Sequence, residues 1–141
     1  MYTEIFDWND LGYQPLVINS NWQVAKLNWE SSFDIRNFHE MERHNHTDEV
    51  FILLKGRAIL LTRYNQGEIF IQEMKTGIVF NVKEGIWHNL LSTRDASWII
   101  IENPNTHLND TEILAVNDRE LIQIKSKLPE WATNLDDTRS I

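Results

Sequence analysis

Short strand-like segments at nearly even spacing fill the middle of this 141-residue chain, and they constrain its fold more than any other feature. β-Branched and aromatic residues are frequent in each segment, and turn residues such as Gly and Asn separate the segments. They span residues 22–29, 33–41, 49–55, 57–64, 68–74, 78–82, 86–92 and 96–103. No helical periodicity is visible before about residue 105. The pattern predicts an all-β fold, an antiparallel sandwich or barrel.

Residues 111–125, TEILAVNDRELIQIK, fit two structures. In the first, the segment forms a β-hairpin that turns at Asn117 and Asp118. In the second, it contains a helix that begins near Asp118. The helix would present one apolar face, formed by Leu121, Ile124 and Leu128. The β-branched content slightly favours strands.

The length and the absence of linkers or repeats predict one domain over residues 1–141. We expect a barrel core at about 22–104, preceded by a short aromatic N-terminal arm and followed by a small C-terminal extension at about 105–141. Within the extension, LPEWATNL predicts a short terminal helix with Pro129 in its first turn. The acidic stretch NLDDTRS, residues 134–140, is typical of a solvated end.

The composition excludes several classes of function. The formal net charge of -8 repels phosphate backbones and anionic membrane surfaces, so we expect neither a nucleic-acid nor a membrane partner. The chain has no cysteine, which excludes disulfides and thiolate chemistry. No apolar run approaches membrane-spanning length, and the first residues lack the features of a signal peptide, so we expect a cytoplasmic protein.

The stretch RHNHTDEVFILLKG, residues 43–56, carries the candidate chemistry. Residues i and i+2 of a strand point to the same face, so His44 and His46 are expected to share one. Asp48 reads as a turn residue, and Glu49 opens the next strand. Two imidazoles and a carboxylate that converge in an apolar interior form a facial ligand set for a divalent metal.

A fourth ligand would come from elsewhere in the sequence, and His88, between a turn and a strand, is the best candidate. The alternatives remain open, because an H-x-H pair alone is more often a surface feature than a pair of ligands. A lone His88 would more often be a core or rim histidine with a satisfied hydrogen bond. We assign no role to His39 and His107.

Taken together, these residues resemble the two sequence motifs of the cupin superfamily, in the form found in small single-domain cupins. The first motif is matched by His44, His46, Glu49 and Gly56, and the second by Gly77, Gly85 and His88. The resemblance implies a double-stranded β-helix, or jelly-roll barrel, with a metal held by His44, His46, Glu49 and His88. It also implies a homodimer formed through paired edge strands.

The chain departs from the cupin pattern at several positions. Only two residues separate His46 from Glu49, a gap one or two residues shorter than is usual in the family. Phe38, Lys83 and Ser92 replace a glycine, a proline and an asparagine that often occur at those positions.

The resemblance implies one divalent transition metal (iron, nickel, manganese, cobalt or zinc) and a small organic molecule in the barrel. The reaction would be that of a metal-dependent dioxygenase, isomerase or lyase. The alternatives are a non-catalytic binding module and a purely structural metal. We expect an inner wall lined by Phe51, Leu53, Leu60, Phe80, Leu90 and Ile100. That mostly apolar wall favours a small or apolar ligand, and no residue stands out as a general base.

Overall fold

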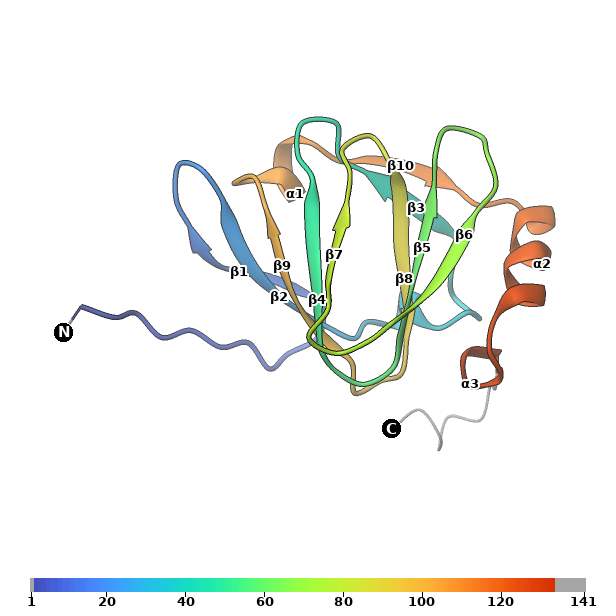
Figure 1. Cartoon of the computed structure of the whole chain (residues 1–141), viewed down its shortest axis with the longest axis horizontal. Helices are drawn as coiled ribbons and strands as arrows, with labels where there is room; N and C mark the ends of the chain where they lie inside the picture. The colour runs from blue at the N-terminus through green and yellow to red at the C-terminus, as the bar shows by residue number, and fades with distance from the viewer. Residues whose placement is uncertain (1, 134–141) are drawn as a thin grey trace.

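Ten antiparallel strands of the described residues, 2–133, form two five-stranded sheets in this computed structural model of the protein (Figure 1). The first sheet has the order β1 (Tyr13–Ile18), β2 (Gln23–Asn28), β9 (Ser97–Glu102), β4 (Glu49–Lys55) and β7 (Val79–Val82). The second has the order β10 (Glu112–Ala115), β3 (Glu40–Arg43), β8 (Trp87–Ser92), β5 (Ala58–Arg63) and β6 (Phe70–Met74).

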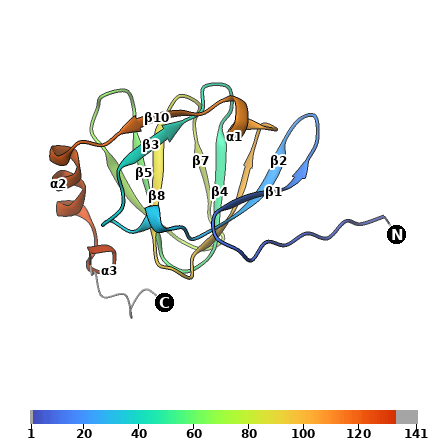
Figure 2. The same cartoon turned by 180° about the vertical axis from the view of Figure 1, so that it is seen from behind.

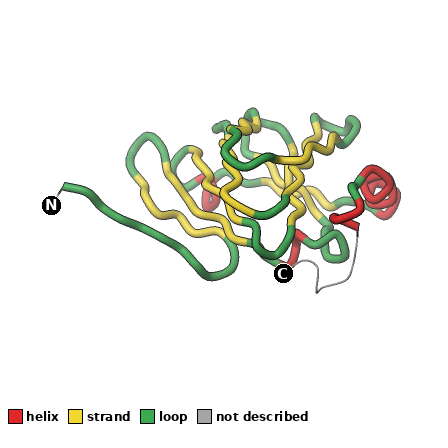
Figure 3. The backbone as a smooth tube through the Cα atoms, turned by 60° about the horizontal axis from the view of Figure 1, so that its bottom comes forward, coloured by secondary structure: helices red, strands yellow, loops and turns green. Residues whose placement is uncertain are grey.

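Strands that follow one another in sequence repeatedly lie in opposite sheets, so the chain winds around the barrel. β4 lies in the first sheet and β5 in the second, while β7, β8 and β9 alternate between the sheets. The tube in Figure 3 shows strands connected mainly by short loops. This is the double-stranded β-helix, or jelly roll, and the prediction of an all-β fold is confirmed.

The main core fills the space between the two sheets. Along β2 and β4, buried residues alternate with more exposed ones, as expected for strands with one face on a core. The core is formed by Ala25, Leu27, Phe33, Phe51, Leu53, Ala58, Leu60, Met74, Val82, Leu90, Ala96, Trp98 and Ile100.

A second core covers the outer face of the second sheet. Its buried members are Ile35, Phe38, Met41, Ile59, Leu61, Ile69, Trp87, Leu91 and Ile124. Ile124 comes from the helix α2 (Asp118–Lys127), which lies beside this sheet in Figures 1 and 2. β5 is therefore buried on both faces, which explains its continuous apolar sequence AILL.

The hairpin favoured for residues 111–125 is wrong, and the helix alternative is correct for its second half. The first half forms β10, and α2 begins at Asp118. A capping box stabilises the helix start, because the Asn117 side chain accepts from the Glu120 N–H and the Glu120 side chain accepts from the Asn117 N–H.

The strand expected at residues 33–41 is also wrong over most of its length. A 3₁₀ turn, η1 (Ser31–Phe33), begins this region, and β3 starts only at Glu40 and ends at Arg43. Phe33 and Phe38 are buried in different cores, so their spacing reflects a loop that crosses the open end of the sandwich.

The N-terminal arm extends away from the barrel (Figures 1 and 2). An ion pair between Asp7 and Lys26, at 2.7 Å, joins the base of the arm to β2. Beyond β10, the short helix α3 (Glu130–Thr133) lies where the terminal helix was expected, and α1 (Thr106–Asn109) precedes β10. The acidic segment 134–140 lies outside the described residues. No helix in the described part of the chain is long and apolar enough to cross a membrane.

Candidate metal centre

A pocket of about 240 Å³ opens between the two sheets at one end of the barrel. Leu27, Phe51 and Ile100 line it from the first sheet, and Glu42 and Leu90 line it from the second. This volume is below the about 300–1,000 Å³ of typical drug-sized ligand sites. The pocket therefore suits a small molecule.

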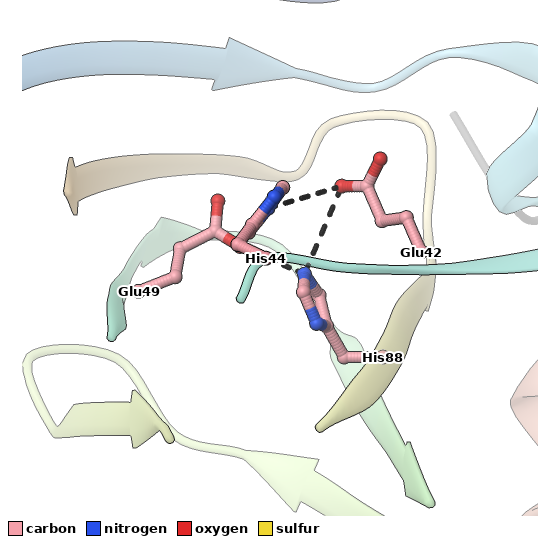
Figure 4. A group of neighbouring side chains, drawn as sticks. All are labelled: Glu42, His44, Glu49 and His88. Carbon is pink, nitrogen blue, oxygen red and sulfur yellow. Dashed lines mark hydrogen bonds and ion pairs between the residues drawn. The ribbon is translucent and has the colours of Figure 1, made fainter. Parts of the chain in front are cut away.

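Four metal-ligating side chains converge in this pocket: Glu42, His44, Glu49 and His88 (Figure 4). Glu42 on β3 pairs in register with His88 on β8, and directly opposite residues of antiparallel strands point to the same face. His44 follows two residues after Glu42, and Glu49 is the first residue of β4.

Glu49 is the centre of the cluster. Its Oε1 lies 2.7 Å from His88 Nε2 and 3.1 Å from His44 Nε2. Glu42 Oε1 lies 3.7 Å and 3.9 Å from the same two nitrogens. One potential ligand atom of each residue lies within 4.8 Å of those of the others.

A hydrogen bond from Nδ1 to a backbone carbonyl orients each imidazole. His44 Nδ1 donates to the backbone carbonyl of Asp110 at 2.7 Å, and His88 Nδ1 donates to the carbonyl of Ile86 at 3.0 Å. These bonds direct both Nε2 atoms into the cluster, as the outer shell of a metal site does for ligating histidines. His88 Nε2 is buried and, despite its closeness to Glu49, makes no hydrogen bond of acceptable geometry.

The cluster contains one buried acid, Glu49, one partly exposed acid, Glu42, and two buried bases, His44 and His88. Burial by itself lowers the pKa of His44, but the hydrogen bond and charge of Glu49 raise it to about 9. The pKa of His88 is also raised, because the charge of Glu49 outweighs burial. Burial opposes ionisation of Glu49, yet the charge of His88 and the hydrogen bond from His44 hold its pKa well below its usual range.

A further carboxyl group, that of Glu102, lies next to Glu49. Burial, followed by the charge of Glu49, raises the pKa of Glu102 to about 9, so this group is neutral at pH 7. Tyr13 donates to Glu102 Oε1 at 3.0 Å, which leaves the buried Oε2 to carry the proton. A neutral carboxyl group in this position can donate to Glu49 and orient it.

The residues of the cluster fit a divalent metal. Ligand atoms at about 2.0–2.2 Å from a zinc-like ion lie at most about 4.4 Å apart. The four distances from Nε2 to Oε1, between 2.7 and 3.9 Å, fall within that limit. The buried Nε2 of His88, which lies 2.7 Å from Glu49 Oε1, is a nitrogen that a metal would bind in place of a proton. Two imidazoles and two carboxylates suit iron, nickel, manganese, cobalt or zinc.

The structure places the His46 side chain outside the cluster, so the four clustered groups do not include this expected ligand. β3 ends at Arg43, so the alternation of a strand does not extend to His46. The chain bends there, because the carboxylate of Asp110 accepts from the backbone N–H groups of Asn45 and His46 at 2.9 Å each. The side chain of His46 is exposed as a result.

Glu42 takes the place that the sequence analysis gave to His46. The strand lies before His44 and not after it, so the residue on the same face is Glu42, two positions earlier, and not His46. The short gap before Glu49 was the missed signal. Four residues separate His44 from Glu49, which matches the longer gap expected from the resemblance.

The residues expected on the inner wall divide into two groups. Phe51, Leu90 and Ile100 line the pocket. Leu53 and Leu60 belong to the core beneath it, and Phe80 packs against that core from the side. The wall is also more polar than expected, because Tyr13, Glu30, Glu102 and the unassigned His39 and His107 all line the pocket.

Comparison with known proteins agrees with this geometry at the level of the fold. No family model matches the sequence, and no curated protein matches it. A protein of Bacillus halodurans has a similar structure, with a TM-score of 0.57 and 18% identity over 82% of this chain and 85% of that chain. An RmlC-like cupin family protein with a double-stranded β-helix fold, from Methanocaldococcus jannaschii, matches with a TM-score of 0.53 and 12% identity over 74% and 93%.

The capsular polysaccharide assembling protein CapF of Staphylococcus aureus matches with a TM-score of 0.58 and 18% identity. The match covers 82% of this chain but only 35% of CapF. A second structure of CapF, which contains the inhibitor 3-isopropenyl-tropolone, matches with a TM-score of 0.52 and 19% identity over 82% of this chain and 36% of that chain. The protein described here has the cupin fold.

Proposed function

We propose that Glu42, His44, Glu49 and His88 hold a divalent transition metal, and that a small organic molecule binds beside it in the pocket. The observation that carries this proposal is the convergence of one potential ligand atom from each of the four residues within 4.8 Å of one another.

The protein supplies orientation and electrostatics at this site. A bound metal would act as a Lewis acid on an oxygen of the ligand. The carbonyls of Asp110 and Ile86 fix the two imidazoles, and the neutral Glu102 orients Glu49. The side chain of Glu42 is 40% exposed, so it stands on the pocket side of the cluster, where a ligand arrives.

An open metal site fits this geometry better than a purely structural one. All four candidate ligands line the pocket, whereas structural zinc sites are closed by their four protein ligands. The reaction would be that of a dioxygenase, an isomerase or a lyase. A non-catalytic module that binds the same ligand is the second candidate, because Phe51, Leu90 and Ile100 give much of the wall an apolar character.

Elemental analysis of protein purified without added metal or chelator tests the proposal. We expect about one metal ion per chain, and its loss in the His44→Ala, His88→Ala double variant with the near-ultraviolet circular dichroism retained. His39→Ala is the control, because His39 is an exposed pocket residue outside the cluster. Absence of metal from the wild type, even after reconstitution with each of the five candidate metals, would contradict the proposal.

A homodimer and a single domain over residues 1–141 remain predictions. The first sheet ends at β7 and the second at β6, where Val79 and Phe70 are exposed. Exposed apolar edge strands of this kind favour pairing with a second copy.

A further inference from the structure

The outer face of the first sheet has the sequence of a covered surface. β4 and β9 carry the continuous apolar runs VFILL and WIII. Runs of this kind are typical of strands that are buried on both faces, and β5, with its run AILL, is such a strand. Among residues 2–133, however, no helix packs along the outer face of the first sheet in the way that α2 packs on the second (Figures 1 and 2).

Two rows of side chains form this outer face. Residues that pair directly across antiparallel strands point to the same side of a sheet. From β2 through β9 and β4 to β7, the rows are Val24, Ile101, Val50 and Asn81, and Lys26, Ile99, Ile52 and Val79. Every apolar member is at least partly exposed, and Val79 is 61% exposed. The two rows contain a single charge, and the centres of protein interfaces are similarly poor in charge.

The N-terminal arm starts on this outer face and then leaves it. The ion pair between Lys26 and Asp7, at 2.7 Å, holds the arm at β2. The side chain of Asn28 donates to the carbonyls of Trp8 and Asp10 and fixes the same segment. The residues before Asp7 extend beyond the edge strand β1, on the side opposite to β9 and β4 (Figure 1). The arm therefore points away from the outer face of its own sheet.

The arm carries enough apolar surface to form an interface with a second chain. Tyr2 is 106% exposed, Ile5 is 87% exposed and Phe6 is 47% exposed. As an extended chain, residues 2–8 expose on the order of 1,000 Å². If half of this area is buried on a partner, two such arms and the matching areas of two sheets bury on the order of 2,000 Å² in total. Stable interfaces bury about 1,200–2,000 Å².

We propose that the outer face of the first sheet and the N-terminal arm form the interface of a homodimer, in which the arm of each chain lies on the outer face of the other. Each chain supplies one arm and one face, so the interface is self-complementary under a two-fold axis. This interface goes beyond the proposed metal site and does not require a metal. It also differs from pairing of the edge strands β6 and β7, because it uses the face of β9 and β4.

Size-exclusion chromatography with light scattering, over a series of protein concentrations, tests the proposal. We expect the wild type to have about twice the 16.7 kDa mass of one chain. Deletion of residues 2–6 and the variant Ile52→Glu should each weaken dimerisation at least about tenfold. The deletion lies outside the barrel, so it tests the interface even where Ile52→Glu disturbs β4. Phe70→Glu is the control, because Phe70 is 60% exposed on the edge strand β6 of the other sheet.

Crosslinking locates the arm, since the chain has no cysteine of its own. A chain with Ile5→Cys is mixed with a chain that carries Ile52→Cys and treated with a short bis-maleimide. We expect a crosslinked pair of the two variant chains. A chain with Ile122→Cys, on the exposed side of α2, replaces the Ile52→Cys chain as the control and should give no such product.

A wild type that stays monomeric over the whole concentration series overturns the proposal. A dimer that persists in both the deletion and Ile52→Glu also overturns it, as does a dimer that is lost in Phe70→Glu. Crosslinking of Ile5→Cys to Ile122→Cys and not to Ile52→Cys would place the arm on another surface and contradict the interface.

Discussion

Glu49 depends on its neighbours more than any other residue of the candidate site. A carboxylate that is only 4% exposed is costly to ionise, and two imidazoles compensate this cost. The same arrangement leaves both Nε2 atoms directed at one point. The protein therefore maintains a metal-binding geometry through charge balance, backbone carbonyls and the neutral Glu102.

Replacing single residues distinguishes the ligand set of the structure from the one that the sequence implied. We expect Glu42→Gln to weaken zinc affinity by at least about tenfold, because it removes a charged ligand. His46→Ala should leave zinc affinity unchanged, since the His46 side chain is exposed and outside the cluster. Zinc titration against a competing chelator measures both. The reverse result would restore His46 as the ligand.

The two histidines also make the stability of the metal-free protein depend on pH. The folded pKa of His44, about 9, exceeds its usual 6.5. Its contribution to stability is therefore complete below pH 6.5 and is lost as pH rises through 9. Glu102 acts in the same direction, because its pKa rises from 4.5 to about 9 and the folded state holds its proton longer.

We therefore expect the free energy of unfolding of the metal-free chain to fall by on the order of 2 kcal/mol between pH 6.5 and 9. Urea unfolding at a series of pH values measures it. The zinc-loaded protein is the comparison, since ligating imidazoles carry no proton and its profile should be flatter. A stability that rises over this interval would contradict the charge balance described for Glu49.

At the scale of elements, the helix α2 has a structural role that is separate from the metal site. It covers the outer face of the second sheet, and that sheet carries Glu42 and His88. Packing of α2 against this face therefore supports the strands β3 and β8, which carry Glu42 and His88.

Two isoleucines of α2 test this role. Ile124 is 1% exposed and Ile122 is 68% exposed. We expect Ile124→Ala to reduce the free energy of unfolding by about 2–4 kcal/mol through lost burial and cavity formation. Ile122→Ala should change it by less than about 0.5 kcal/mol. Chemical denaturation of both variants decides the matter, and equal effects would mean that the helix does not dock through Ile124.

The corner between β4 and β5 depends on Gly56. Its φ is +82°, and a Cβ there would lie 2.7 Å from Ala96 Cα. Gly77 has a similar φ of +78° with no atom within 4 Å of the same position. The two glycines therefore share backbone strain but differ in steric contact.

We expect Gly56→Ala to cost about 3 kcal/mol of stability, from left-handed strain and from overlap with the Ala96 backbone. Gly77→Ala should cost only about 1 kcal/mol, from the strain alone. Thermal and urea unfolding give both values. A similar cost for the two variants would show that the close approach to Ala96 is relieved elsewhere.

At the scale of the whole molecule, the two cores are formed without the candidate ligands. None of Glu42, His44, Glu49 and His88 belongs to either apolar cluster. Burial of apolar surface therefore supplies the driving force for the fold, and a bound metal would add to it.

We accordingly expect the chelator-treated protein to remain folded, with its near-ultraviolet circular dichroism intact. Zinc at about one hundred times its dissociation constant should raise stability by about 2.7 kcal/mol, or about 8 °C in Tm. Differential scanning calorimetry with and without zinc measures the shift. Loss of the fold on chelation would instead identify a structural metal.

The sequence by itself determined the all-β fold, the position of most strands and three of the four clustered groups. Alternating and β-branched runs bounded by turns are local signals, and local signals are enough to locate strands such as β4 and β8. His44, Glu49 and His88 were found because each stands at the beginning of a strand or next to one. The two cupin-like motifs, which occur in the expected order along the chain, added support for the fold.

Only the tertiary structure decided that Glu42, and not His46, lies in the cluster and that α2 is a helix. The face of a side chain depends on where its strand ends, and β3 ends at Arg43 because Asp110 binds the backbone of the following bend. Asp110 lies far from that bend in the sequence, so no local pattern contains this contact. The helix is likewise selected by the apolar outer face of the second sheet, which exists only after the strands have paired.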